Sequence, residues 1–246
     1  MSNSNSTVTA KQKTRDVLLY LLTVSSGAID AISFLELGKV FSAFMTGNVA
    51  FLGLRIAGNS APEIPALLSS MLAFALGVYV STRIVGPTKV LWSSRVTYAL
   101  AISLVAHAFF QIVWFSFGGH PTEQGIFGLL GLWAFAMGMQ SAAVRALHVD
   151  AVYTTAATAT VIFLVSDLVN WKATVVERKR LVGILLSLMV GATGGGLMLS
   201  HSHLYAPILP FIITLCTVIA ASVVMRNSDQ LPIDNPSPAP NPIAKV

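Results

Sequence analysis

Long apolar runs separated by short polar stretches fill most of this chain between residues 17 and 225. A helix that crosses a bilayer needs roughly 20 predominantly apolar residues. The pattern predicts six such helices: Val17–Leu35, Ile64–Ile84, Val96–Phe117, Gly125–Val144, Leu181–Leu199 and Leu204–Met225. The first run follows a polar, basic stretch and lacks the small-residue exit of a cleaved signal peptide, so we expect it to be retained.

Two further apolar segments, Val40–Ile56 and Ala151–Val169, are shorter or more polar. The first contains "SAFMTGNVAF", in which Thr46-Gly47-Asn48 interrupts the apolar pattern. Non-helical backbone at membrane depth must be buried in protein or line a wet cavity. We therefore expect each segment to be a re-entrant or broken helix that returns on the side it entered. The alternative is that both segments span, which gives eight crossings.

Composition places the chain in the membrane. It is 54% hydrophobic and 10% charged, with a mean hydropathy of +0.74, whereas soluble domains carry about 25% charged residues. The expected fold is an all-α integral membrane protein with one transmembrane domain over residues 16–225. Residues 1–15 and the Pro-rich residues 226–246 are predicted to be disordered cytoplasmic tails. The single cysteine, Cys216, excludes an intrachain disulfide or a cysteine metal cluster.

The distribution of Lys and Arg favours six spans over eight, because cytoplasmic loops are enriched in these residues. With six spans and a cytoplasmic amino terminus, thirteen of the fifteen basic residues lie inside, and Lys39 and Arg55 lie outside. With eight spans, ten of the fifteen lie inside. Both termini are then cytoplasmic, in a cytoplasmic (inner) membrane.

The two halves of the chain resemble each other. Gly27 aligns with Gly138, Asp30 with Ser141, and Thr46-Gly47-Asn48 with Thr158-Ala159-Thr160. The halves, residues 16–119 and 123–225, each hold three predicted spans and one short segment. Because each half crosses three times, the halves would have opposite orientation, as in the inverted repeats of many transporters. Eight crossings would instead make the repeat parallel.

The stretches "GAIDAISFLELGKVFSAFMTGN", "GMQSAAVRAL" and "TTAATAT" resemble the YoaK-like family of bacterial membrane proteins, a domain of unknown function, over roughly residues 15–225. The second copy of the triplet departs from Thr-Gly-Asn, which puts equal roles for the two segments in doubt. The resemblance implies a multi-span bacterial membrane protein and no particular substrate.

Polar residues within the apolar runs are the candidates for function. Asp30 lies in the first span, where a charge is costly and often marks an ion or proton site; an interhelical hydrogen bond is the alternative. Gly47 permits a break or close approach, and Thr46 and Asn48 can bond freed backbone groups or touch a solute. Gln140, Thr158 and Thr160 could extend a polar path, although threonines also bond their own helix.

Arg55 and Asp167 fall at equivalent positions of the two halves and could form a charge pair between them. The alternative is that both lie at interfacial ends and face water.

The function that this pattern favours is a small-solute or ion transporter or channel, with a midplane site formed by the paired broken segments. The alternative is a non-transporting scaffold, sensor or assembly factor. The sequence carries no phosphate-binding loop and neither the H-E-x-x-H nor the G-x-S-x-G motif. We therefore expect no enzyme activity, no cofactor and no metal. Expected partners are the lipid bilayer and an unidentified solute or cation, with no nucleic acid; a homo-oligomer is possible.

Overall fold

A computed structural model describes residues 2–88, 90–147, 160–162, 164–166, 175–226 and 228, with side chains from residue 9 onwards and not for 175–177. Its helices are α1 (Ser2–Glu36), α2 (Met45–Ile56), α3 (Ile64–Val85), α4 (Ser94–Ser116), α5 (Glu123–Arg145), α7 (Val175–His201), the 3₁₀ turn η1 (His203–Tyr205) and α8 (Ile208–Val224). All regular elements among these residues are helical. The predicted all-α class is confirmed.

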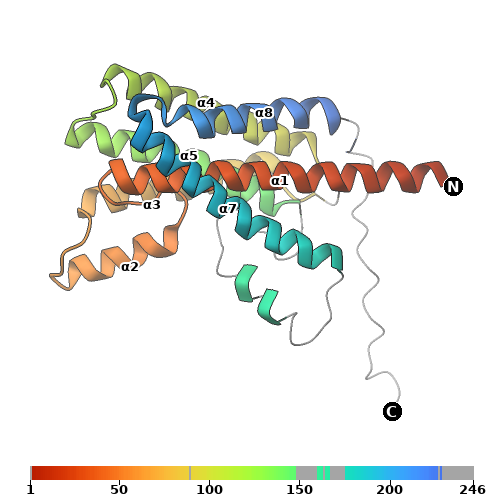
Figure 1. Cartoon of the computed structure of the whole chain (residues 1–246), viewed down its shortest axis with the longest axis horizontal. Helices are drawn as coiled ribbons and strands as arrows, with labels where there is room; N and C mark the ends of the chain where they lie inside the picture. The colour runs from red at the N-terminus through yellow and green to blue at the C-terminus, as the bar shows by residue number, and fades with distance from the viewer. Residues whose placement is uncertain are drawn as a thin grey trace, which may run out of the picture.

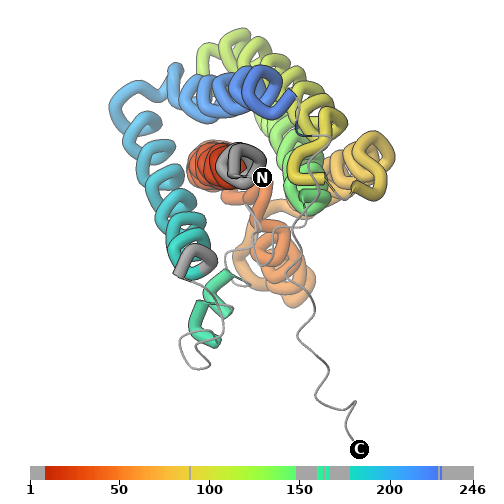
Figure 2. The backbone as a smooth tube through the Cα atoms, turned by 90° about the vertical axis from the view of Figure 1, so that its right-hand side faces the viewer, coloured from red at the N-terminus to blue at the C-terminus, as the bar shows by residue number. Residues whose placement is uncertain are grey.

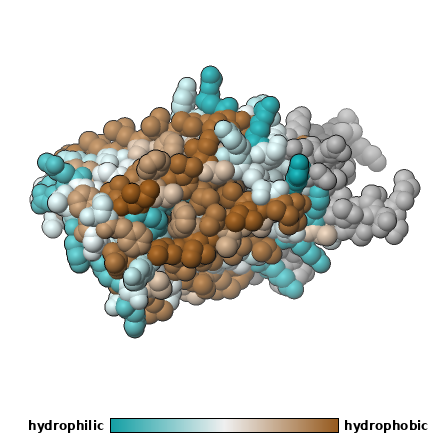
Figure 3. All heavy atoms as spheres, turned by 90° about the horizontal axis from the view of Figure 1, so that it is seen from above, coloured by the Kyte–Doolittle hydropathy of each residue, from teal (hydrophilic) through white to brown (hydrophobic). Residues whose placement is uncertain are grey.

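Six helical stretches are long and apolar enough to cross a membrane, and they match the six predicted spans. In Figure 1, α1, α4 and α7 run away from the end at which the amino terminus lies, and α3, α5 and α8 return to it. Figure 2 shows α1 in the middle, surrounded by α7, α8, α4 and α5. Apolar side chains cover the middle of the face seen in Figure 3, and polar ones gather toward its ends.

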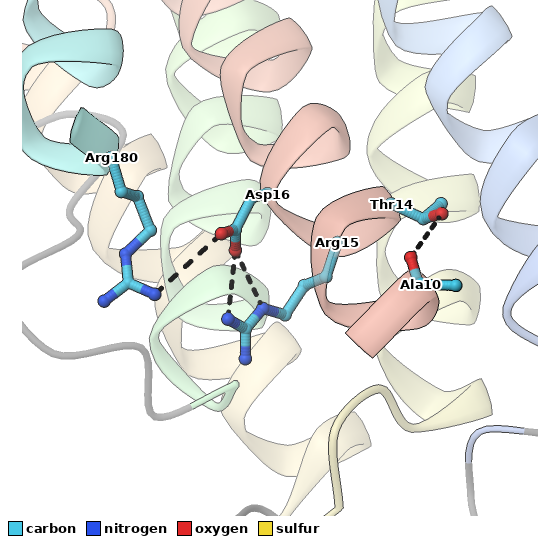
Figure 4. A network of polar contacts seen from close by, with 5 residues as sticks. All are labelled: Ala10, Thr14, Arg15, Asp16 and Arg180. Atoms are coloured by element: carbon cyan, nitrogen blue, oxygen red, sulfur yellow. Dashed lines mark hydrogen bonds and ion pairs between the residues drawn. The ribbon is translucent and has the colours of Figure 1, made fainter. Parts of the chain in front are cut away.

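The end at which α1 begins is rich in basic residues. Arg83 and Arg145 occupy the last turns of α3 and α5, and Arg178–Arg180 lie near the start of α7. Asp16 of α1 accepts a hydrogen bond from Arg15 at 2.9 Å and lies 3.9 Å from Arg180 (Figure 4). This acidic side chain therefore links α1 to α7 within the basic end.

Glycines bring α1 and α7 into backbone contact. A Cβ on Gly27 would meet the carbonyl oxygen of Leu188 and lie 3.0 Å from the Ala192 nitrogen. From the other side, Cβ atoms on Gly191 and Gly195 would meet the backbone of Val24 and Ala28. Small residues allow membrane helices to approach this closely.

The pair α3 and α5 repeats this contact. A Cβ on Gly138 would meet the carbonyl oxygen of Phe74 and lie 3.0 Å from the Val78 nitrogen, and one on Gly77 would meet Phe135 in the same way. Gly138 of α5 follows Gly27 of α1 by 111 residues. Their partners are offset in the same way, since Phe74 and Val78 of α3 precede Leu188 and Ala192 of α7 by 114 residues. The two glycine contacts are thus equivalent, residue by residue.

One feature differs from the sequence prediction, and another decides between its two alternatives. Helix α1 begins at Ser2, although residues 1–15 are predicted to be a disordered tail; this stretch contains neither Gly nor Pro to end the helix. Helix α2 has 12 residues, which at 1.5 Å per residue makes it about 18 Å long, too short for a hydrocarbon core of about 30 Å. The eight-span alternative therefore fails for the segment 40–56.

Candidate functional site

The segment between α1 and α3 enters the bundle and returns. Helix α1 ends at Glu36, and the chain reverses through Gly38 and Lys39, both with positive φ. It then runs back alongside α1, so that the Ser42 hydroxyl lies 2.7 Å from the Ser33 hydroxyl. Helix α2 carries the chain outward again (Figure 1). Residues 37–56 thus form a re-entrant segment, as the sequence predicted.

The carboxylate of Asp30 holds the innermost part of this segment. Its Oδ1 accepts hydrogen bonds from the backbone N–H groups of Ser42 at 3.0 Å and Ala43 at 2.7 Å. These N–H groups directly precede α2, whose amino end carries a partial positive charge. Asp30 therefore binds freed backbone donors of the re-entrant segment, and its negative charge is stabilised by the helix dipole.

Asn48 closes the same segment from within α2. Its Oδ1 accepts from the Phe41 N–H at 3.0 Å, and its Nδ2 donates to the Phe41 carbonyl at 2.7 Å. Ser70 of α3 donates to that carbonyl as well, at 2.7 Å, and lies 3.3 Å from Asn48 Nδ2. Asn48 and Ser70 are fully buried, so both polar groups of the Phe41 backbone are satisfied away from water.

Phenylalanine rings pack around this turn. Phe34 stacks on Phe41 at 4.9 Å between centroids, Phe41 stacks on Phe51 at 6.1 Å, and Phe44 meets Phe41 edge to face at 5.3 Å. A Cβ on Gly47 would lie 2.7 Å from the Phe44 ring. Gly47 therefore permits close approach within the first turn of α2, and the break in the helix lies before it, at residues 37–44.

The site lies nearer the end of α1 and the start of α3 than the middle of these helices. Asp30 is six residues from the end of α1, and Ser70 is six residues from the start of α3. At 1.5 Å per residue both are about 9 Å from those ends, whereas the midplane lies about 15 Å deep. The predicted midplane position is therefore wrong for this segment, because α2 contributes only its first turn to the interior.

The remaining predicted residues are distributed differently. Thr46 is exposed on α2. Gln140 is fully buried on α5 and donates to the Leu22 carbonyl at 3.2 Å, away from the re-entrant segment. Thr160 is fully buried and helical. Thr158 lies outside the described residues.

Arg55, in the last turn of α2, pairs with Glu63 at 2.5 Å in the connection to α3. Its suggested partner Asp167 lies outside the described residues.

Several residues of the site were missed in the sequence. Ser33, Ser42 and Ser70 bond the re-entrant segment, but isolated serines in apolar runs carry no distinctive signal. A usable signal was Gly38 directly after the first apolar run, because a glycine with positive φ commonly ends a helix. It places the break before the Thr-Gly-Asn triplet.

The hydrogen bonds of Asp30 determine how binding of an ion there would affect the re-entrant segment. Asp30 is partly exposed, and a proton or cation that binds its carboxylate would compete with the two N–H donors. Neutralising the carboxylate weakens charge-assisted hydrogen bonds, which are roughly twice as strong as neutral ones. Ion binding at Asp30 would therefore loosen the re-entrant segment.

Comparison with known proteins agrees with this architecture. The family model "Protein of unknown function (DUF1275)" matches residues 18–220. The chain belongs to this family. It is 34% identical over 155 residues to the UPF0700 transmembrane protein YoaK of Bacillus subtilis (strain 168), covering 63% of this chain and 67% of that protein. No solved structure matches. Asp30 and the triplet lie within the family match, so the re-entrant segment belongs to the shared domain.

Proposed function

We propose that this protein is a transporter or channel for a small solute or cation, without enzyme activity, whose pathway passes the re-entrant segment 37–56. The observation that carries the proposal is the Asp30 carboxylate, within a spanning helix, bound to the backbone of that segment. A charge within a membrane span is costly. Its position at a broken helix is the usual setting of an ion or solute site in transporters.

In this proposal Asp30 is the ion-binding residue, and the segment 41–48 moves when Asp30 is neutralised. Thr46, exposed at the start of α2, and Gly47 lie beside the path. Asn48 is the positioning residue, since its amide is bonded to the Phe41 backbone. A proton or a monovalent cation fits a site with a single carboxylate.

The glycine contacts support an inverted repeat as the framework of this pathway. The contact of Gly27 with α7 matches the contact of Gly138 with α3. The pair α1 and α7 runs one way in Figure 1, and the pair α3 and α5 runs the other way. A two-fold axis in the membrane plane relates two such pairs. The second segment, with Thr158 and Thr160, would then approach from the opposite side, and Arg55 and Asp167 would occupy equivalent places.

The orientation we propose puts the basic end of the bundle, with both termini, in the cytoplasm of a bacterium and the turn at Gly38 outside. The proposal rests on the positive-inside rule. The outer end holds the re-entrant segment, so the Asp30 site would open toward the outside.

Cysteine labelling tests this topology. In a Cys216→Ser background, we expect Asn59→Cys to react in intact cells with a membrane-impermeant maleimide and Thr88→Cys to react only after permeabilisation. Asn59 lies between α2 and α3, and Thr88 lies between α3 and α4. The reverse labelling pattern would contradict the proposed orientation.

Loss of the Asp30 charge tests the transport function. In proteoliposomes on a solid-supported membrane, we expect a current when the outside concentration of H⁺ or Na⁺ is raised. Asp30→Asn keeps an acceptor oxygen for the Ser42 and Ala43 N–H groups but removes the charge, so it should reduce the current by about tenfold or more while the protein stays folded.

Glu63→Gln is the matched control, because Glu63 is an exposed carboxylate at the same end of the bundle and pairs only with Arg55 among the described residues. It should leave the current unchanged. An unchanged current in Asp30→Asn would remove Asp30 from the pathway. No ion current and no solute uptake in the wild type would favour the scaffold or sensor alternative.

A further inference from the structure

Four buried polar side chains on α4 and α5 have atoms without a hydrogen-bond partner among the described residues. These atoms are both ring nitrogens of His107, Oε1 of Gln111, Nε1 of Trp133 and Oε1 of Gln140. His107, Trp133 and Gln140 are fully buried, and Gln111 is 8% exposed.

The four residues lie on two helices, α4 and α5, that pack against each other. Phe110 lies flat on Trp133, with centroids 3.6 Å apart and an angle of 1° between the rings. His107 precedes Phe110 by three residues and Gln111 follows it by one. Because α4 and α5 run in opposite directions (Figure 1), His107 lies at a depth between Trp133 and Gln140. Along the helix axes these four residues, here named the polar column, extend over about 12 Å at 1.5 Å per residue.

Neighbouring helices fix the orientation of both glutamines. Gln111 donates its Nε2 to the Pro207 carbonyl before α8, at 2.5 Å, and Gln140 donates its Nε2 to the Leu22 carbonyl of α1, at 3.2 Å. Each amide is therefore held by its nitrogen, and its carbonyl oxygen is left as an acceptor. Leaving a buried polar atom unpaired costs about 1–3 kcal/mol. Five such atoms on α4 and α5 therefore favour a bound small molecule, called the guest below, that forms hydrogen bonds with them.

The chemistry of the column defines that guest. The two glutamine oxygens are acceptors, the Trp133 N–H is a donor, and a neutral imidazole at His107 supplies one donor and one acceptor. Among the described residues, Arg15 is the only buried charged side chain, and it lies at the basic end beside Asp16. A cation would need a carboxylate and an anion would need Arg or Lys, so the column suits an uncharged molecule.

We propose that α4 and α5 hold an interior site, formed by His107, Gln111, Trp133 and Gln140, for a small uncharged solute with both donor and acceptor groups, such as an alcohol or a primary amide. The site involves neither Asp30 nor the re-entrant segment. It therefore stands or falls separately from the proposed ion pathway.

Thiol reactivity tests the site, with acetamide and glycerol as probes. In the Cys216→Ser background, Gln140→Cys should react with N-ethylmaleimide about tenfold faster than Leu100→Cys, because the reactive thiolate needs a polar surrounding. Leu100 is fully buried in the apolar core. Molar acetamide or glycerol should slow the reaction at Gln140→Cys severalfold, whereas NaCl of equal osmolarity should not. The exposed Asn59→Cys reports any direct effect of the probes on the reagent.

Equal rates for Gln140→Cys and Leu100→Cys would overturn the proposal, as would equal protection by NaCl and acetamide. A second measurement needs no substitution in the observed protein. In wild-type protein with ¹⁵N-labelled histidine, the His107 signals, assigned by their loss in His107→Gln, should shift on acetamide titration. The other four histidines serve as internal references. No shift at His107 would contradict a guest in contact with the imidazole.

Discussion

Replacing Gly191 by alanine should destabilise the protein more than any other single-methyl addition on α7. The new Cβ would meet the carbonyl oxygen of Val24, which belongs to the backbone of α1 and cannot rotate away. Overpacking costs roughly 1–3 kcal/mol, and we expect the upper part of this range because a whole helix must shift. The measurement is the fraction of monodisperse protein that remains in detergent after heating.

Gly196→Ala is the control on the same helix, since a Cβ there meets nothing within 4 Å. Alanine is favoured over glycine in a helix interior by about 1 kcal/mol, so this variant should be neutral or slightly more stable. Equal melting of the two variants would show that α1 and α7 do not approach as closely as described.

The similarity of the two halves allows a second comparison of alanine variants. Gly138→Ala should be destabilised to the same degree as Gly27→Ala, because each new Cβ would meet the equivalent carbonyl oxygen on α3 or α7. Gly128→Ala, with open space around the Cβ, is the control on α5. A large difference between Gly27→Ala and Gly138→Ala would argue against two equivalent halves.

The six spans could be predicted from the sequence because the hydropathy of many consecutive residues adds up in each of them. About 20 apolar residues in a row outweigh any single polar one, and each predicted span overlaps an observed helix. The short α2 gave no comparable signal. Whether Val40–Ile56 spans or re-enters depended on charges elsewhere in the chain, and those charges favoured re-entry.

The details of the site could not be predicted, because they depend on contacts between distant residues. The sequence showed that Asp30 is an unusual residue for a span, but not that its partners are the N–H groups of Ser42 and Ala43. It showed Gly47 as a possible break, whereas the structure makes Gly47 a contact surface for the Phe44 ring. The polar column of α4 and α5 arises only when the helices pack.

The second large effect is expected at Asn48, which we predict to be the residue on which the re-entrant segment depends most. Asn48→Leu keeps the side-chain size but removes the fully buried amide whose oxygen accepts from the Phe41 N–H, and this N–H is then left without an acceptor. A buried donor without a hydrogen-bond acceptor lowers the stability of the fold by about 1–3 kcal/mol. We expect the amides of residues 37–44 to exchange with deuterium at least about tenfold faster, together with a lower melting temperature.

Substitutions at two neighbouring residues should accelerate deuterium exchange less than Asn48→Leu does. Ser70→Ala removes one of the two donors to the Phe41 carbonyl and leaves the other, Asn48 Nδ2, so its effect should be smaller. Thr46→Val changes an exposed side chain of similar shape in the same turn and should leave exchange unchanged. The expected order is therefore Asn48→Leu, then Ser70→Ala, then Thr46→Val. If Thr46→Val accelerated exchange as much as Asn48→Leu, the stability of the segment would come from the packing of α2 and not from the bonds of Asn48 to the Phe41 backbone.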